Sequence, residues 1–183
     1  MIFFRGKLDS IVRFMSSKSK KDTKLPGKFY EDSSCLYLIQ NFMENLNQIV
    51  EFESGSLFLF EKESRTLKEV ANKGDGLNFI SAVHFPMGTG LSAWVAQKGK
   101  LIYLPDIHRG SRHGQNPVRS YLSMPLEINN KIVGVLNLGH VVPNAFDEKE
   151  IKQIESLSKE ITRKIYNRIY LNLDSYEQKD STH

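Results

Sequence analysis

Cysteine is almost missing from this sequence: Cys35 is the only one among 183 residues. A single cysteine cannot form an internal disulfide or a cysteine-rich metal site, so a reducing, cytoplasmic location is the simplest interpretation. Long hydrophobic runs are also missing, and no segment approaches the roughly 20 apolar residues that a transmembrane helix requires. Arg5, Lys7 and Asp9 interrupt the apolar start of the chain, and no small-residue cleavage site follows, so we expect no secretory signal.

Positive charge is concentrated at the beginning of the chain. Residues 1–28 hold eight Lys or Arg against two Asp, a net charge of +6, whereas the remaining residues hold 17 Lys or Arg against 19 Asp or Glu, a net charge of −2. A nucleic-acid-binding domain would carry its basic residues on folded elements, so we expect no sequence-specific nucleic-acid binding. We expect instead a weak contact of this basic arm with an acidic partner or a membrane surface.

The composition also indicates the domain organisation. Apolar residues at helical spacing predict a short amphipathic helix at residues 3–16, inside the basic arm, and a polar linker ending in Pro-Gly follows at residues 16–27. The chain length and its 40% content of hydrophobic residues suit one globular domain, which we place at residues 29–173. Residues 174–183 form a polar tail.

The first half of the domain reads as a helix followed by strands. From Asp32, a good capping residue, apolar residues recur at alternating intervals of three and four, which predicts a helix of about 18 residues. These apolar residues are Leu36, Ile39, Met43, Leu46 and Val50. Strands are predicted at 56–61 and 66–71 as a hairpin, with a possible third strand at 81–86. Glycines at positions 88 and 90 then precede a short helix at 91–97.

The second half contains a hairpin and a long helix. A short strand at 101–104 and a polar loop precede strands at 121–128 and 131–140, and Asn129 and Asn130 between these strands tolerate the positive φ of a tight turn. The last helix begins at Asp147, with Glu150 as its capping-box partner and Phe146 placed to pack on Ile151. This order predicts an α+β fold, with an antiparallel sheet of five or six strands and both terminal helices on one face.

Several local patterns in this order resemble the GAF domain family. They are the segments 88–95, 101–106, 120–126 and 131–138, followed by Phe146 and an acidic helix start. The resemblance covers about residues 31–173 and depends on the ordered series rather than on any one segment. It implies a GAF/PAS-like fold, in which the short helix and loops lie on the sheet face opposite the terminal helices and a small molecule binds between them.

The signatures of particular GAF ligands are missing. GAF domains of phosphodiesterases that bind cyclic nucleotides carry an Asn-Lys pair after the last strand, where this sequence has His140 and Val141. Bilin-binding GAF domains use a pocket cysteine, whereas Cys35 lies in the first helix. GAF-like free methionine-(R)-sulfoxide reductases need at least two loop cysteines, so we expect no enzyme and no catalytic residues. The reductase is kept as the third alternative.

The loop at 106–116 gathers positive charge. Arg109 and Arg112 within it, and Arg119 after it, suit a carboxylate or phosphate, and His108 adds a pH-dependent charge. The start of the short helix would add backbone N–H groups nearby. One interpretation is an anionic ligand held between loop and helix, and the other is a solvated surface loop. His108 and His113 have no further ligand at a recognisable spacing, so we predict no metal site.

The predicted ligand site combines the short helix, its neighbouring loop and the strands. Its residues are Phe79, Gly90, Leu91, Ser92, Trp94, Tyr103, Asp106, His108, Arg109, Arg112, Arg119, Tyr121 and Ser123. These residues do not identify the ligand or any cofactor.

The terminal helices carry more apolar surface than one sheet face can cover. Tyr166, Tyr170, Leu171 and Leu173 extend the apolar stripe of the last helix, which predicts a homodimer through helices near 36–50 and 151–173. The sequence therefore predicts a non-catalytic sensory domain that binds a small molecule and signals through a helical dimer interface. The alternative is a protein-interaction module with a degenerate pocket.

Overall fold

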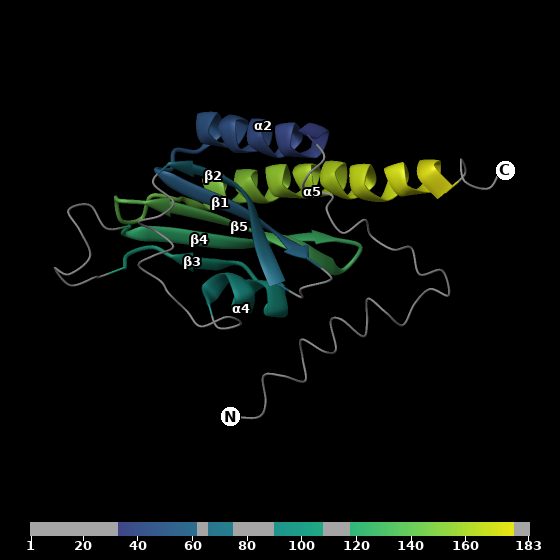
Figure 1. Cartoon of the computed structure of the whole chain (residues 1–183). Coiled ribbons are helices and arrows are strands. Elements are labelled where there is room, and N and C mark those ends of the chain that lie inside the picture. Colours follow the sequence, from purple (N-terminus) through teal and green to yellow (C-terminus); the bar gives the residue numbers. More distant parts are fainter. Residues whose placement is uncertain (1–32, 62–65, 75–89, 108–117, 178–183) are drawn as a thin grey trace, which may run out of the picture.

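The computed structural model describes residues 33–61, 66–74, 90–107 and 118–177. Within these ranges the chain forms one sheet with helices on both of its faces (Figure 1). In chain order the elements are α2 (Ser33–Ile49), β1 (Ser54–Glu61), β2 (Thr66–Gly74), α4 (Leu91–Lys98), β3 (Ile102–Leu104), β4 (Ser120–Ile128), β5 (Lys131–His140) and α5 (Glu148–Glu177).

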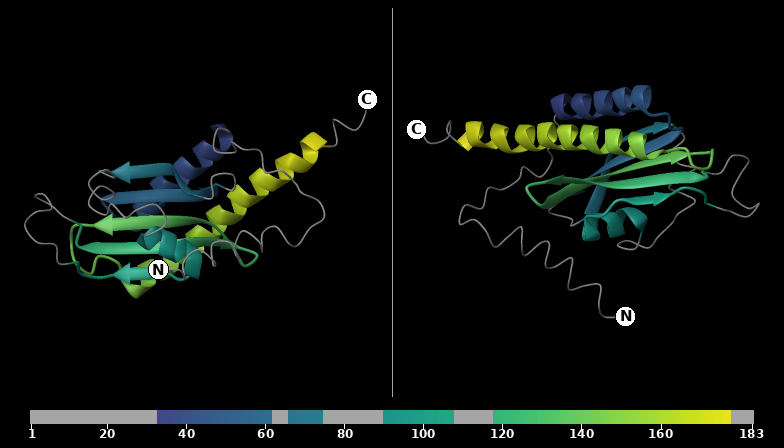
Figure 2. Two further views of the ribbon diagram at one scale, coloured as in Figure 1. Left: turned by 60° about the horizontal axis from the view of Figure 1, so that its bottom comes forward. Right: turned by 180° about the vertical axis from the view of Figure 1, so that it is seen from behind.

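The five strands of the described part pair antiparallel, in the spatial order β2-β1-β5-β4-β3. β5 is therefore the central strand, hydrogen-bonded to β1 on one side and to β4 on the other. α2 and α5 lie together on one face of the sheet, and α4 lies on the other face (Figures 1 and 2). This arrangement confirms the predicted α+β fold with both terminal helices on one face.

The hydrophobic core lies between the sheet and the layer formed by α2 and α5. Gly134 of β5 lets this strand lie close to β1, because a Cβ at position 134 would be only 2.2 Å from the carbonyl oxygen of Phe58 in β1. Fully or nearly fully buried side chains from both layers fill the space, among them Ile39, Leu46, Leu57, Leu122, Leu136, Leu138, Ile154 and Ile165. The sheet face toward α4 is thus separated from this core by a single layer of backbone.

Local sequence rules account for the turn and the helix start that follow. Asn129 and Asn130 both have positive φ, 51° and 60°, as predicted for a two-residue hairpin. At the start of α5, the backbone N–H of Glu150 donates to Asp147 Oδ1 (2.7 Å), and the N–H of Asp147 donates to Glu150 Oε2 (2.8 Å). The predicted capping box is confirmed.

Other features differ from the prediction or cannot be compared with it. α2 packs against both β2 and α5, so it buries a broader face than the single apolar stripe that was predicted. This face includes Cys35 and Phe42, whereas Leu36 of the predicted stripe is only half-buried. α5 continues to Glu177, past the boundary predicted at residue 174. The helix predicted at 3–16 and the strand predicted at 81–86 lie outside the described residues. No helix in the described part is long and apolar enough to cross a membrane.

Candidate functional site

The sheet face that α4 covers carries polar side chains at its centre. Side chains alternate along a strand, so Tyr121 and Ser123 of β4 and Val135 and Asn137 of β5 point away from α2 and α5. The register places Ser123 of β4 opposite Asn137 of β5, and Ser56 of β1 opposite Asn137 on its other side. This face therefore brings hydroxyl and amide groups from three adjacent strands together.

Asn137 is the centre of this group, which we call the Asn137 cluster: Ser56, Ser92, Tyr121, Ser123 and Asn137. The Oδ1 atom of Asn137 accepts hydrogen bonds from the hydroxyls of Ser123 (2.7 Å), Tyr121 (2.9 Å) and Ser92 (3.3 Å). Its Nδ2 atom donates to Ser92 Oγ at 3.0 Å and to Ser56 Oγ at 3.5 Å. A carbonyl oxygen has two lone pairs, so the third and longest bond to Oδ1, from Ser92, is the weakest.

The cluster is buried. Ser123 is 0% exposed, Asn137 and Ser56 are 3% exposed and Tyr121 is 4% exposed, while Ser92 is half-buried and connects the cluster to the surface. A buried polar group costs about 1–3 kcal/mol when it has no partner, and even a paired one lacks the gain of an apolar side chain. Stability alone therefore does not explain this group of polar residues, which makes the cluster the candidate functional site.

Tyr121 stays a hydrogen-bond donor at neutral pH. Burial raises the pKa of its phenol above the ordinary value of 10.0, and hydrogen bonds with Ser123 and Ser92 offset only part of that rise. The hydrogen bonds of the cluster join hydroxyls to one amide and include no general base. The arrangement can therefore bind polar groups, but it contains no activated nucleophile.

α4 holds Ser92 over the sheet. Gly90 precedes the helix in an extended conformation, and the backbone N–H of Trp94 donates to its carbonyl oxygen (2.8 Å). The helix ends at Gly99, whose φ of 62° suits glycine. Val95 is 0% exposed whereas Trp94 is 38% exposed. α4 therefore presents Ser92 and Val95 to the sheet and leaves Trp94 partly in solvent.

Three of the predicted ligand residues, Ser92, Tyr121 and Ser123, meet in the cluster, and Gly90 and Leu91 adjoin Ser92 at the start of α4.

Tyr103 does not join them. It pairs with Leu122 of β4, which places its ring on the face of α2 and α5. Its hydroxyl lies 3.5 Å from Ser120 Oγ and accepts a hydrogen bond from the backbone N–H of Phe146 (3.3 Å). The predicted position of Tyr103 is therefore corrected, because strand alternation gives the α4 face to its neighbours Ile102 and Leu104.

Asp106 and Arg119 are paired with each other. The Nε atom of Arg119 donates to Asp106 Oδ1 (2.8 Å), and its Nη2 atom lies 2.6 Å from the same oxygen. The backbone N–H of Ile107 also donates to the carbonyl oxygen of Arg119 (2.6 Å). These contacts join the described residues on either side of positions 108–117, and the carboxylate neutralises the guanidinium. Arg119 is therefore better placed to hold Asp106 and Ile107 than to bind an anion.

Four predicted site residues lie outside the described residues: Phe79, His108, Arg109 and Arg112. The anion site predicted from the loop stays a prediction.

Asn137 and Ser56 are the cluster residues that sequence reasoning missed. A strand covered on both faces is expected to be an almost continuous apolar run. Asn137 interrupts such a run between Leu136 and Leu138, and Ser56 begins one in β1. An amide in the middle of an apolar strand was the signal that could have identified the cluster.

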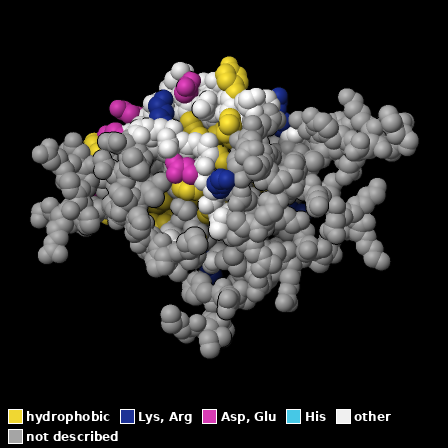
Figure 3. Space-filling view, viewed as in Figure 1, with side chains coloured by type: hydrophobic (Ala, Val, Ile, Leu, Met, Phe, Trp, Pro, Cys, Tyr) yellow, Lys and Arg dark blue, Asp and Glu magenta, His cyan; other side chains and the backbone are white. Residues whose placement is uncertain are grey.

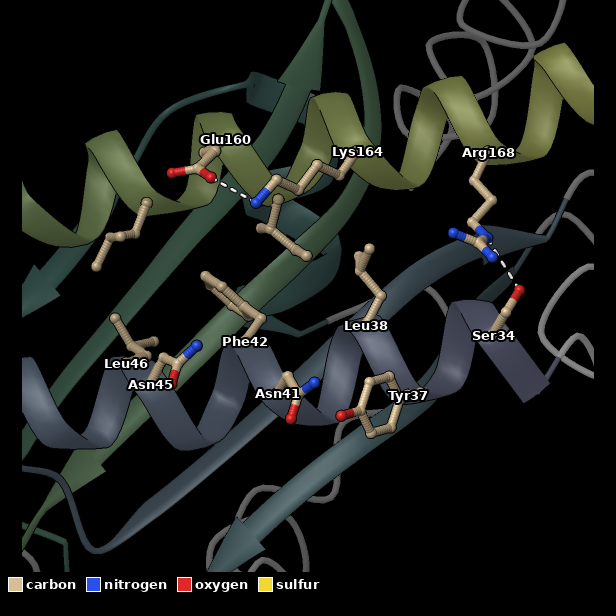
Figure 4. Close-up of a pocket in the computed structure, with 12 residues that line it drawn as sticks. Ser34, Tyr37, Leu38, Asn41, Phe42, Asn45, Leu46, Glu160, Lys164 and Arg168 are labelled. Atoms are coloured by element: carbon tan, nitrogen blue, oxygen red, sulfur yellow. Dashed lines mark hydrogen bonds and ion pairs between the residues drawn. The ribbon is translucent and has the colours of Figure 1, made fainter.

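A second feature lies on the side of the sheet opposite the Asn137 cluster, where a groove of about 510 Å³ runs between α2 and α5 (Figure 4). Leu38, Phe42 and Leu46 extend from α2 toward α5 and form much of its apolar lining. Tyr37 is 67% exposed beside them. Hydrophobic side chains also appear among charged ones over the helical layer in the space-filling view (Figure 3).

Charged residues of α5 line the other side of this groove. Lys164 Nζ lies 2.5 Å from Glu160 Oε1, and hydrogen bonding by Lys164 lowers the pKa of that carboxyl. Arg168 Nε donates to Ser34 Oγ (2.9 Å), which connects α5 to the first turn of α2. Both pairs are visible in Figure 4. The groove thus has an apolar floor and a polar rim.

The sequence model of the GAF domain family matches residues 38–165. This match spans most of α2, all five described strands, α4 and most of α5. No curated protein matches the chain at significant similarity.

Solved structures share the fold at low sequence identity. The GAF domain of a phosphoenolpyruvate-protein phosphotransferase from Coxiella burnetii is 16% identical, with a TM-score of 0.60, and covers 89% of this chain and 95% of its own. A domain of a two-component sensor histidine kinase protein from Sinorhizobium meliloti is 17% identical, with a TM-score of 0.54 and coverage of 72% and 90%. The free methionine-R-sulfoxide reductase of Neisseria meningitidis is 18% identical, with a TM-score of 0.57 and coverage of 90% and 88%.

Proposed function

The chain belongs to the GAF domain family, whose members are mostly sensory and regulatory, and we propose that it is a non-catalytic sensor that binds a small molecule between its sheet and α4. The observation that carries this proposal is the Asn137 cluster. Small-molecule sites combine apolar walls with a few convergent polar groups. The cluster supplies such groups at the centre of the sheet face, and Ser92 connects it to the surface.

The position of Cys35 supports binding without catalysis. Its side chain is 1% exposed and packs in the core between α2 and the sheet, on the face opposite the Asn137 cluster. A thiol in that position cannot reach a ligand under α4 without unfolding the core. The sulfoxide reductase, the third alternative, would need a reactive thiol at the ligand.

We further propose that binding is signalled through a homodimer of the helical layer. β5 connects the two faces, because Asn137 points toward α4 while Leu136 and Leu138 pack against the layer of α2 and α5. A shift of β5 on ligand binding would displace the side chains of α2 and α5 that pack on it, since close-packed cores transmit small displacements. The groove between α2 and α5 offers the surface on which a second copy would dock.

A metabolite screen by thermal shift, followed by native mass spectrometry, tests the proposal. A ligand at about 100 times its Kd should stabilise the domain by about 2.7 kcal/mol, which raises Tm by roughly 5–10 °C. Trp94 is the only tryptophan and lies on α4, so its fluorescence should change with the same ligand. Trp94→Phe, which lacks the only tryptophan, is the control and should show no such fluorescence change.

The second candidate, a protein-interaction module, is favoured by the exposed apolar groove between α2 and α5. A broad screen without any stabilising compound, together with a dimer in solution, would support that candidate and contradict the sensor.

A further inference from the structure

We infer that the part of the ligand that reaches the Asn137 cluster is a neutral hydrogen-bond acceptor, such as a carboxamide or lactam carbonyl, and that it binds Asn137 Nδ2 in place of Ser92. This inference rests on the proposed function and specifies the chemistry of its ligand. It differs from the anion predicted from the loop at 106–116, because it concerns the polar centre of the sheet face.

The hydrogen-bond geometry indicates an acceptor. Tyr121 and Ser123 already provide short bonds to both lone pairs of Asn137 Oδ1. Of the two N–H groups of Nδ2, one reaches Ser56 only at 3.5 Å, and the other donates at 3.0 Å to Ser92, a half-buried residue of α4 rather than of the sheet. A ligand that enters from the surface meets these donors, and a carbonyl oxygen would satisfy them.

The charges of the cluster indicate a neutral group. Its five side chains are hydroxyls and one amide, and burial keeps the phenol of Tyr121 protonated at neutral pH by raising its pKa. Among the described residues of the predicted site, Arg119 is the one that carries a positive charge, and its ion pair with Asp106 already neutralises that charge. Moving a carboxylate from water into such a site is unfavourable without a compensating charge.

Ser92 is the member of the cluster that a ligand can replace. It belongs to α4, whereas the other four lie on the sheet, and its bond to Oδ1 is the longest of the three at 3.3 Å. Removing its hydroxyl leaves Nδ2 without this partner. The Ser92→Ala variant should therefore bind an acceptor more tightly, the opposite of the usual effect of deleting a polar site residue.

Two isosteric probes, benzamide and benzoate, test the inference by NMR titration of the labelled full chain at millimolar concentration. Benzamide should shift the side-chain amide resonances of Asn137, and benzoate should not. The Asn137→Asp variant keeps an acceptor for Tyr121 and Ser123 but loses Nδ2, so benzamide should bind about tenfold more weakly. Asn167→Asp on the exposed surface of α5 is the matched control and should bind as the unaltered protein does.

The variants and probes give distinct outcomes. Tighter benzamide binding by Ser92→Ala, which keeps a good helix former in α4, supports the inference even if Asn137→Asp does not fold. Equal binding of both probes, unchanged benzamide binding in both variants, or binding of neither probe overturns it. The proposed function survives these results if the metabolite screen yields a ligand that changes Trp94 fluorescence, so the two failures can be told apart.

Discussion

At the scale of single residues, the α4 face depends on a side chain that both donates and accepts. An aspartate at position 137 would accept hydrogen bonds but donate none, and a leucine would do neither, whereas the amide accepts from Tyr121 and Ser123 and donates to Ser56 and Ser92. Buried networks of this kind are favourable only when every member is paired. The long bond to Ser56 and the half-buried position of Ser92 therefore mark the side of the cluster that is open to exchange.

Tyr121 should make the domain less stable as the pH rises into the alkaline range. Because burial raises its pKa in the folded state, the folded protein keeps the phenolic proton after the unfolded chain has lost it. The contribution of Tyr121 is fully present below the unfolded pKa of about 10, and the free energy of unfolding should fall by up to about 1.4 kcal/mol per pH unit above it. Urea unfolding at about pH 8 and about pH 11 measures the difference.

Tyr121→Phe removes this group, so its stability should decline less between the two pH values. Tyr37→Phe removes an exposed phenol instead and should decline as the unaltered protein does. A Tyr121→Phe variant that declines in parallel with the unaltered protein would show that the phenol is not held in its neutral form by the fold.

At the scale of elements, the structure confirms the features that local sequence determines. The Asn129-Asn130 turn and the Asp147 cap involve neighbouring residues, so their chemistry can be recognised without knowledge of the fold. The buried residues of α2 were less predictable, because that helix packs against two elements and buries Phe42 as well as the expected stripe. The face occupied by Tyr103 depends on the register of β3 with β4, which the sequence of one short strand does not determine.

The cap of α5 should contribute measurably to stability. Asp147→Ala removes the acceptor for the backbone N–H of Glu150 and should lower the free energy of unfolding by about 1 kcal/mol. Asp147→Asn keeps a side-chain oxygen at the same position and should retain most of that energy. Urea unfolding of both variants measures the effect, and equal losses in the two would mean that the charge of Asp147, rather than its hydrogen bond, stabilises the helix.

At the scale of the whole molecule, the candidate site is assembled from residues that are distant in the sequence. Ser56 and Ser92 lie 81 and 45 positions before Asn137, and only the strand order and the placement of α4 bring the three together. Resemblance to a family could indicate the region of the candidate site and three residues of the Asn137 cluster, but it could not identify the amide at the centre. The helical groove was predicted only in part: the sequence indicated surplus apolar surface on the terminal helices, but not that Tyr37, Leu38 and Phe42 line a groove between them.

The groove between α2 and α5 should be a homodimer interface. Its apolar floor and the exposed ring of Tyr37 form the kind of surface that a second copy covers, and aromatic residues commonly contribute much of the binding energy of such interfaces. The Tyr37→Glu variant should therefore weaken the dimer by about tenfold or more, or about 1.4 kcal/mol, while the fold is retained because the side chain is exposed. Sedimentation at micromolar concentration measures the dissociation constant.

The choice of variant decides whether this experiment is informative. Ile165→Glu would place a charge in the core, since Ile165 is only 1% exposed, and loss of the dimer would then reflect unfolding. Val142→Glu is a suitable control for Tyr37→Glu, because Val142 is 52% exposed and does not line the groove. A dimer that persists in Tyr37→Glu as in Val142→Glu, or an unaltered protein that sediments as a monomer, would rule out the groove as the route by which ligand state reaches a second copy.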